Sequence, residues 1–147
     1  MKFIFYILPL LAGVALSIQS GVNSQLRTVV NNPILAAFIS FLTGTAALII
    51  MLFFSKKEMP SWDIYAGISW YKYTGGLLGV LVVVSVILSV PRIGAANMFV
   101  LIILGQLLTA VIMDHYGILG MQPNSFNVKK LVGVLFLIAG AYLVNKK

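Results

Sequence analysis

The sequence predicts an all-α integral membrane protein with five transmembrane helices. Hydrophobic residues make up 61% of the chain and charged residues 9%, whereas soluble proteins average about 45–50% and about 25%. The mean hydropathy is +1.05. Ten basic and three acidic residues cannot cover the surface of a soluble fold. The composition therefore excludes a soluble enzyme, a disordered chain and a nucleic-acid-binding domain, and the expected surroundings are a lipid bilayer.

The first two spans are separated by a short polar connection. A span needs roughly 17–25 mainly apolar residues, and the first covers residues 3–22 before the sequence turns polar at Asn23. The second covers residues 33–54. Asn32 is a favourable N-cap for it, and Pro33 sits at the first helical position, where its missing N–H costs nothing.

The chain start also resembles a secretory signal peptide, because Met1-Lys2 precedes an apolar run. No clean small-x-small site closes that run. Its second half carries Gln19 and Asn23, which suit the interior of a helix bundle. We therefore expect this segment to remain as the first span of one five-helix domain covering residues 1–147.

The last three spans cover residues 73–90, 94–113 and 128–144. Helix-breaking or charged residues close them: Pro91 and Arg92, Asp114 and His115, Lys129 and Lys130, and Lys146 and Lys147. The fifth is short and spans if its lysines snorkel to the membrane surfaces. The longest connection, residues 55–72, is rich in aromatic residues and predicts an interfacial segment. Residues 114–127 are expected to form a loop.

The charge distribution fixes the orientation weakly. The formal net charge is +7, and five spans place the two termini on opposite faces. One face receives six cations: Lys2, Lys56, Lys57, Lys72, Lys129 and Lys130. The other receives four: Arg27, Arg92, Lys146 and Lys147. Six against four mildly favours a cytoplasmic N-terminus, and it also permits insertion in both orientations.

Small residues recur at helical spacing on every span. Helices in lipid associate through such seams, unless the residues simply reflect the frequency of glycine and alanine in membrane helices. The expected packing residues are Gly13, Ser17, Ser20, Ser40, Gly44, Gly75, Gly79, Gly105, Gly133 and Gly140. Together they predict a tight bundle with several contact faces.

Two groups of polar residues interrupt the apolar spans. Gln19 and Asn23 lie four residues apart on the first helix, and Gln106 and Thr109 lie three apart on the fourth. An unpaired amide in hydrocarbon costs a few kcal/mol, so these side chains should meet partners or water. Two interpretations follow. They hold the bundle together by hydrogen bonds, or they line a cavity for a solute.

Chemistry-bearing motifs are scarce. Asp114 and His115 end the fourth helix, so they predict either a helix-end contact or proton coupling. No span carries a carboxylate at its middle, which argues against an obligatory deep proton carrier. The chain has no cysteine, no phosphate-binding loop, no histidine pair at metal-ligand spacing and no nucleophile elbow. We expect no enzyme activity, no metal and no cofactor.

Several motifs together resemble the YdcZ-like branch of the drug/metabolite transporter superfamily, small bacterial inner-membrane proteins. On the first two helices the matching positions are Gly13, Gln19, Asn23, Leu26, Pro33, Ser40-Phe41 and Gly44. Further on they are Trp70, Gly75-Gly76, Gly79, the stretch 91–96, Gly105-Gln106-Leu107, the stretch 114–117 and the glycines of 133–140. The resemblance covers essentially the whole chain.

The resemblance implies a transporter built from two five-helix repeats of inverted topology, of which this chain would be one half. An odd number of spans independently requires two oppositely inserted copies for such symmetry. The chain departs from the small multidrug carriers because its first helix offers Gln19 and Asn23 and no glutamate. This departure puts proton-coupled cation export in doubt and leaves neutral or zwitterionic metabolites open.

The sequence therefore supports a small-solute carrier acting as an antiparallel dimer, with itself or with an oppositely oriented relative. In this hypothesis Gln19, Asn23, Gln106 and Thr109 line the site, and Trp70 and Tyr73 gate it or stack on the solute. The main alternative is a membrane scaffold or accessory subunit whose seams bind another helical protein. A passive channel is weaker, because the polar residues occur only in patches.

Overall fold

The computed structural model describes residues 3–55, 57, 59–124 and 127–146, and these residues form helices and connections without strands. Five of the described helical segments are long and apolar enough to cross a membrane: Ile4–Val30, Pro33–Phe54, Trp70–Ile93, Ala95–Tyr116 and Val128–Asn145. The predicted all-α class with five spans is confirmed. The chain divides between Arg92 and Ile93 into two compact units.

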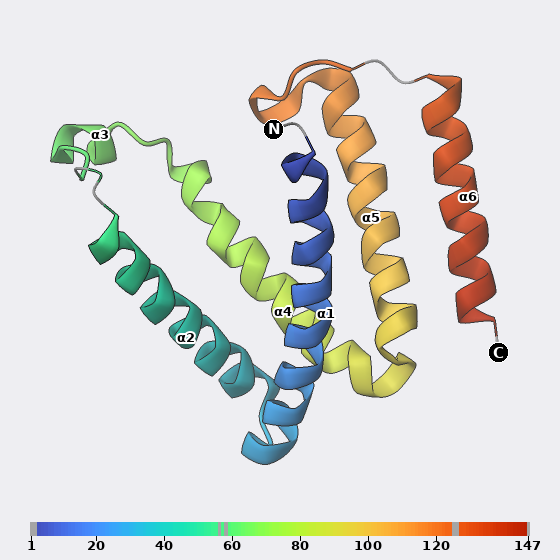
Figure 1. The fold of residues 1–147 in the computed structure, drawn as a ribbon, viewed down its shortest axis with the longest axis horizontal. Coiled ribbons are helices and arrows are strands. Elements are labelled where there is room, and N and C mark those ends of the chain that lie inside the picture. Colours follow the sequence, from blue (N-terminus) through green and yellow to red (C-terminus); the bar gives the residue numbers. More distant parts are fainter. Residues whose placement is uncertain (1–2, 56, 58, 125–126, 147) are drawn as a thin grey trace. The chain divides into compact units, whose positions relative to one another are not determined.

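The first unit contains α1 (Ile4–Val30), α2 (Pro33–Phe54), the short α3 (Trp62–Ala66), the 3-10 turn η1 (Trp70–Tyr73) and α4 (Thr74–Ile93). Its long helices pack together at the end that holds the α1–α2 turn. Ala36 and Ala37 of α2 and Ile87 of α4 are buried there, against Leu26 and Val30 of α1. From that turn α1 and α2 diverge (Figure 1).

The α1–α2 turn follows the local sequence as predicted. Asn31 adopts a left-handed conformation with φ 50°, which ends α1. The Asn32 side-chain oxygen then accepts hydrogen bonds from the main-chain N–H groups of Ile34 (2.9 Å) and Leu35 (3.1 Å). Pro33 occupies the first turn of α2. The predicted N-cap is therefore confirmed.

Two helix ends differ from the predicted spans. α1 continues to Val30 rather than ending near Val22, because hydropathy marks the part of a helix that suits lipid and not where its hydrogen bonding stops. α4 includes Pro91 and ends at Ile93. A proline in a last turn removes one main-chain hydrogen bond without a following turn to disturb. The break comes at Gly94, whose φ of 82° and ψ of 157° suit only glycine.

The second unit is a helical hairpin. α5 (Ala95–Tyr116) and α6 (Val128–Asn145) pack side by side (Figure 1), and the 3-10 turn η2 (Ile118–Gly120) follows α5. Described residues of the predicted loop contact the end of α5. Gly117 caps α5 with φ 62°, and the Asn124 N–H donates to the main-chain oxygen of Asp114 at 2.8 Å.

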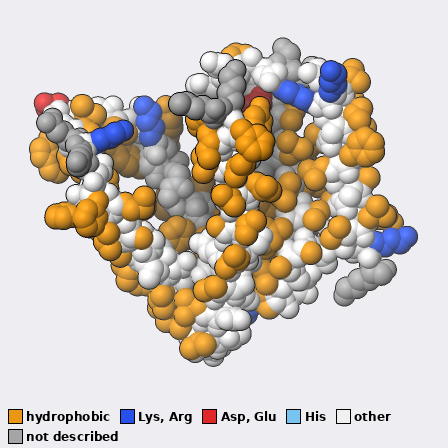
Figure 2. Space-filling model, viewed as in Figure 1, with side chains coloured by type: hydrophobic (Ala, Val, Ile, Leu, Met, Phe, Trp, Pro, Cys, Tyr) orange, Lys and Arg blue, Asp and Glu red, His pale blue; other side chains and the backbone are white. Residues whose placement is uncertain are grey.

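Apolar side chains cover the spans. In the most apolar window of each span, no more than 11% of the residues are buried. Figure 2 shows hydrophobic side chains along the helices, and the lysine and arginine side chains visible there lie near helix ends. This distribution is the one expected of helices in contact with lipid. Lys2, Lys56 and Lys147 lie outside the described residues, so the cation count for each face stays a prediction.

Candidate functional site

The strongest candidate site lies in the first unit, around the middle of α1. Gln19 and Asn23 are one turn apart and line the same cavity, as their spacing predicts. Gln19 borders a pocket together with Gly44 and Thr45, which lie near the middle of α2 (Pro33–Phe54), so in a spanning orientation its amide lies inside the bilayer. The part of the chain that the structure describes provides no hydrogen-bond partner for either amide.

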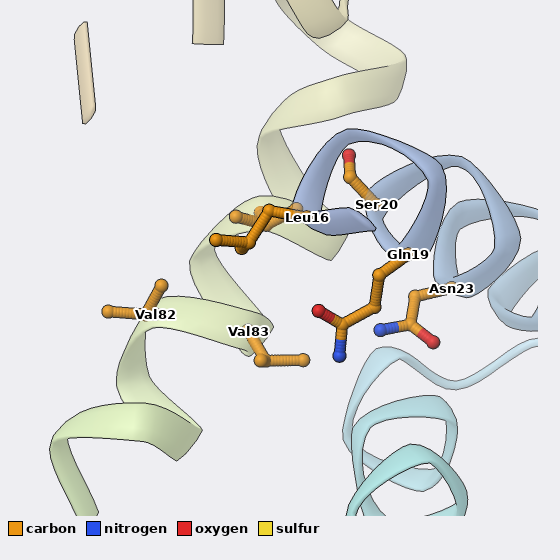
Figure 3. Close-up of a pocket in the computed structure, with 7 residues that line it drawn as sticks. Leu16, Gln19, Ser20, Asn23, Val82 and Val83 are labelled. Atoms are coloured by element: carbon orange, nitrogen blue, oxygen red, sulfur yellow. The ribbon is translucent and has the colours of Figure 1, made fainter. Parts of the chain in front are cut away.

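The first cavity lies between α1 and α4 and has a volume of about 20 Å³. That volume holds about one water molecule. Leu16, Gln19, Ser20 and Asn23 line it from α1, and Val82, Val83 and Val86 line it from α4. Figure 3 shows the two amide groups lying close to each other beside Val83, with the Ser20 hydroxyl directed elsewhere.

A larger pocket lies between α1 and α2, with a volume of about 260 Å³. Its walls come from Gln19 and from Ser40, Phe41, Gly44, Thr45 and Leu48. The Gln19 side chain therefore borders both hollows, one towards α2 and one towards α4. The larger pocket approaches the lower end of the volume range of small-molecule sites, about 300–1,000 Å³.

The walls of both hollows are uncharged. Their polar groups are the amides of Gln19 and Asn23 and the hydroxyls of Ser40 and Thr45, since Ser20 lines the small cavity with its hydroxyl directed away. Histidine, aspartate and glutamate form no metal-binding group within the described ranges. The arrangement can donate and accept hydrogen bonds, and it has no lining group to carry a proton or balance an ion.

The Ser20 hydroxyl oxygen is the one fully buried side-chain polar atom among the described residues that lacks a hydrogen-bond partner. Its residue is 2% exposed, and the neighbouring Asn23 is 4% exposed. By contrast, Ser17 is exposed and its hydroxyl donates to the Gly13 oxygen at 3.2 Å. Ser20 and Ser17 were both expected to pack helices, and only Ser20 is buried.

Trp70 and Tyr73 line neither hollow. They lie in η1, at the start of the helical segment that becomes α4, and both are well exposed. The Tyr73 hydroxyl donates to the main-chain oxygen of Tyr65 at 3.4 Å. Nine residues of helix separate Tyr73 from Val82, which corresponds to about 14 Å along the axis. A gating role for Trp70 and Tyr73 stays a prediction.

Gln106, Thr109, Asp114 and His115 belong to the second unit. The Gln106 and Thr109 side chains are exposed on α5, and Asp114 is half-buried near its end. The main-chain oxygen of Asp114 receives the loop N–H of Asn124, and the His115 ring packs edge-on against Tyr116 at 4.8 Å. A site shared by these residues with Gln19 and Asn23 stays a prediction.

Most of the expected packing glycines face open space. A methyl group built on Gly79 would meet the Phe41 ring at 3.6 Å, so Gly79 accommodates that ring. At the other six nothing lies within 4 Å of such a methyl group: Gly13, Gly44, Gly75, Gly105, Gly133 and Gly140. Ser40 and Gly44, expected to pack helices, instead line the larger pocket.

Thr45, Phe41 and Leu48 are site residues that the sequence reasoning did not assign to the site. They recur at spacings of four and three on α2, so they share one face. That periodicity was readable in the sequence. In an apolar helix, however, it resembles an ordinary lipid-facing stripe, and only the position of Gln19 opposite it distinguishes the two.

The comparisons with known proteins concern the family of the chain. A family model described as "Putative inner membrane exporter, YdcZ" matches residues 4–143. The searches of curated proteins and of solved structures found no match. The matched region includes all five spans except the last residues of α6. The chain therefore belongs to the YdcZ family of the drug/metabolite transporter superfamily, a family of multi-pass transport proteins of the inner membrane.

Proposed function

We propose that the chain is one half of an antiparallel dimeric carrier that moves a small neutral or zwitterionic solute by alternating access. One observation carries the proposal: the Gln19 amide borders two hollows near the middle of a spanning helix and has no partner in the described chain. An unsatisfied amide at that depth is costly unless water or a solute meets it.

The dimer follows from symmetry and from open surfaces. Five spans put the two ends of one chain on opposite sides, so an inverted pair of repeats requires a second, oppositely inserted copy. Apart from Gly44, which lines the larger pocket, five of the expected packing glycines face open space: Gly13, Gly75, Gly105, Gly133 and Gly140. Small residues are the surfaces through which membrane helices approach each other closely. A second copy, or an oppositely oriented relative, would fill those seams.

In the proposed mechanism, Gln19 and Asn23 bind the solute through amide hydrogen bonds, and one half rocks against the other around them. Gln106 and Thr109 of α5 are the further polar residues proposed to bind the solute. Trp70 and Tyr73 act from the membrane surface as a gate. Asp114 holds the end of α5 or couples a proton, since no charged residue lines the two hollows.

A metabolite screen on purified protein tests the carrier function. Solutes that stabilise the wild-type protein are expected to bind Gln19→Leu with a Kd about tenfold higher. The reason is that an uncharged hydrogen bond contributes about 0.5–1.5 kcal/mol. Gln25→Leu is the matched control, since Gln25 lies on α1 outside both hollows. Solute flux into liposomes should fall in the same order.

The scaffold alternative predicts a different pattern. If Gln19 is buried dry against another protein, Gln19→Leu or Gln106→Leu will retain or improve assembly, and no solute in the screen will stabilise the wild-type chain. That result would exclude the carrier.

A further inference from the structure

We propose that the pocket between α1 and α2 binds a small uncharged solute of the polyol or amide type. The proposal rests on the carrier function only in that this solute would be the cargo, since binding can be measured without transport. It assigns a solute-binding role to Ser40, Thr45 and Phe41, with Gln19 shared between this pocket and the smaller cavity.

The pocket contains polar groups that the helices themselves do not use. The hydroxyls of Ser40 and Thr45 and the amide of Gln19 have no hydrogen-bond partner within the described residues. Thr43, on the same helix, behaves differently, because its hydroxyl donates to the Ile39 oxygen at 2.6 Å and to the Ser40 oxygen at 3.0 Å. Serine and threonine in membrane helices commonly make such bonds to their own backbone. Ser40 and Thr45 therefore remain available to a ligand.

The depth of the pocket argues against a lipid chain as its occupant. Gly44 and Thr45 lie near the middle of α2 (Pro33–Phe54), and Gln19 of α1 borders the same pocket at their level. Hydrocarbon offers no hydrogen bonds there, so three unpaired polar side chains would all stay unsatisfied against acyl chains. A solute with hydroxyl or amide groups satisfies them, because each of the three can both donate and accept.

The absence of charge among the wall residues excludes ions as the preferred cargo. A cation would find one aromatic ring, Phe41, and no carboxylate. A single cation–π contact is weaker than the cost of removing an unpaired ion from water. An anion would find no lysine or arginine among the walls. The Phe41 ring and Leu48 instead suit the C–H face of a polyol or the carbon chain of an amide, in a pocket of about 260 Å³.

The natural absence of cysteine makes a direct test possible. Leu48→Cys places one thiol in the pocket wall, and Leu52→Cys places one on the same helix a turn further on, outside the pocket. Xylitol or malonamide, each at a concentration of about ten times its Kd, leaves only about one site in eleven empty. N-ethylmaleimide should therefore label Leu48→Cys about tenfold more slowly. Labelling of Leu52→Cys should not change.

Ionic probes and hydroxyl variants decide the solute class. Tetraethylammonium and lactate at equal osmolarity should leave the Leu48→Cys rate unchanged. Three results would each overturn the proposal. Either ion protects the thiol, neither neutral solute protects it, or the thiol never reacts because lipid or a helix fills the pocket. If Leu48→Cys does not fold, equilibrium dialysis of labelled xylitol replaces it. In that assay Thr45→Val should weaken binding and the control Thr43→Val should not.

The two proposals can fail separately. The protein could transport another solute, lose that transport in Gln19→Leu and show no protection of Leu48→Cys by neutral solutes. Those results would support the proposed function and refute this site. Protection at Leu48→Cys without flux in liposomes retains the site and refutes the carrier.

Discussion

At the residue scale, the hydroxyls of Ser17 and Ser20 on α1 differ in whether the helix satisfies them. Ser17 bonds back to Gly13, whereas Ser20 is buried without a partner among the described residues. A buried unsatisfied hydroxyl costs about 1–3 kcal/mol. Ser20 also lines the small cavity beside Gln19 and Asn23. The first unit therefore holds an energetically unfavourable polar group next to its candidate site.

Ser20→Ala is expected to raise the free energy of unfolding in detergent by about 1 kcal/mol more than Ser17→Ala does, because only Ser20 loses an unsatisfied donor. Both substitutions gain the same helix propensity, so their difference reports the buried Ser20 hydroxyl together with the exposed hydrogen bond that Ser17→Ala removes. Denaturation in increasing SDS, followed by circular dichroism, measures it. Equal stability of the two variants would mean that the Ser20 hydroxyl finds a partner in the membrane.

The contrast between Asn32 and Ser20 explains which residue-scale features can be predicted from sequence. The Asn32 cap depends on N–H groups two and three residues ahead, so the local sequence determines it. The fate of Ser20 depends on which residues of α4 lie opposite, and no local pattern specifies that. Gln19 and Asn23 were predictable as a pair because four residues make one helical turn, but their position beside Val83 was not.

At the scale of the elements, hydropathy predicts the five spanning helices. It does not predict where they end, because a helix ends where its main-chain hydrogen bonding stops. α1 extends two turns beyond its apolar part, because a polar helix end is stable wherever water or headgroups meet it. α4 passes through Pro91 and ends at Gly94. Thr45 was missed for a related reason, since a face of α2 has a function only in relation to the helix opposite.

Gly94 connects α4 and α5 with a backbone conformation that other residues adopt only at a cost. Gly94→Ala should lower the free energy of unfolding by about 1–3 kcal/mol, the strain expected for a side chain in this region. Gly105→Ala is the control: Gly105 is helical with open space around it, and the change should be neutral or stabilising by up to about 1 kcal/mol. Thermal unfolding in detergent compares the two. Similar losses in both variants would contradict a special role for the Gly94 conformation.

At the scale of the whole molecule, the proposed inverted-repeat carrier makes a chain of five spans incomplete by itself. Its spans leave most apolar residues exposed and most predicted packing glycines open. The sequence predicts this incompleteness through the odd number of spans alone. It cannot distinguish a second copy from an oppositely oriented relative, because both would contact the same surfaces and both depend on the weak charge bias.

If the chain dimerises with itself, fixing its orientation should abolish transport. Arg27→Gln with Arg92→Gln lowers the smaller cation count from four to two and should hold the N-terminus in the cytoplasm. Lys56→Gln, Lys57→Gln, Lys72→Gln, Lys129→Gln and Lys130→Gln together lower the larger count from six to one, against four on the other face, and should favour the opposite orientation. C-terminal reporters on the wild type should score on both sides of the membrane, and on each variant on one side.

Neither variant should transport alone, and co-expression should restore flux, because the two orientations are then supplied separately. A wild-type chain with one orientation that transports without an oppositely inserted relative would rule out the antiparallel dimer.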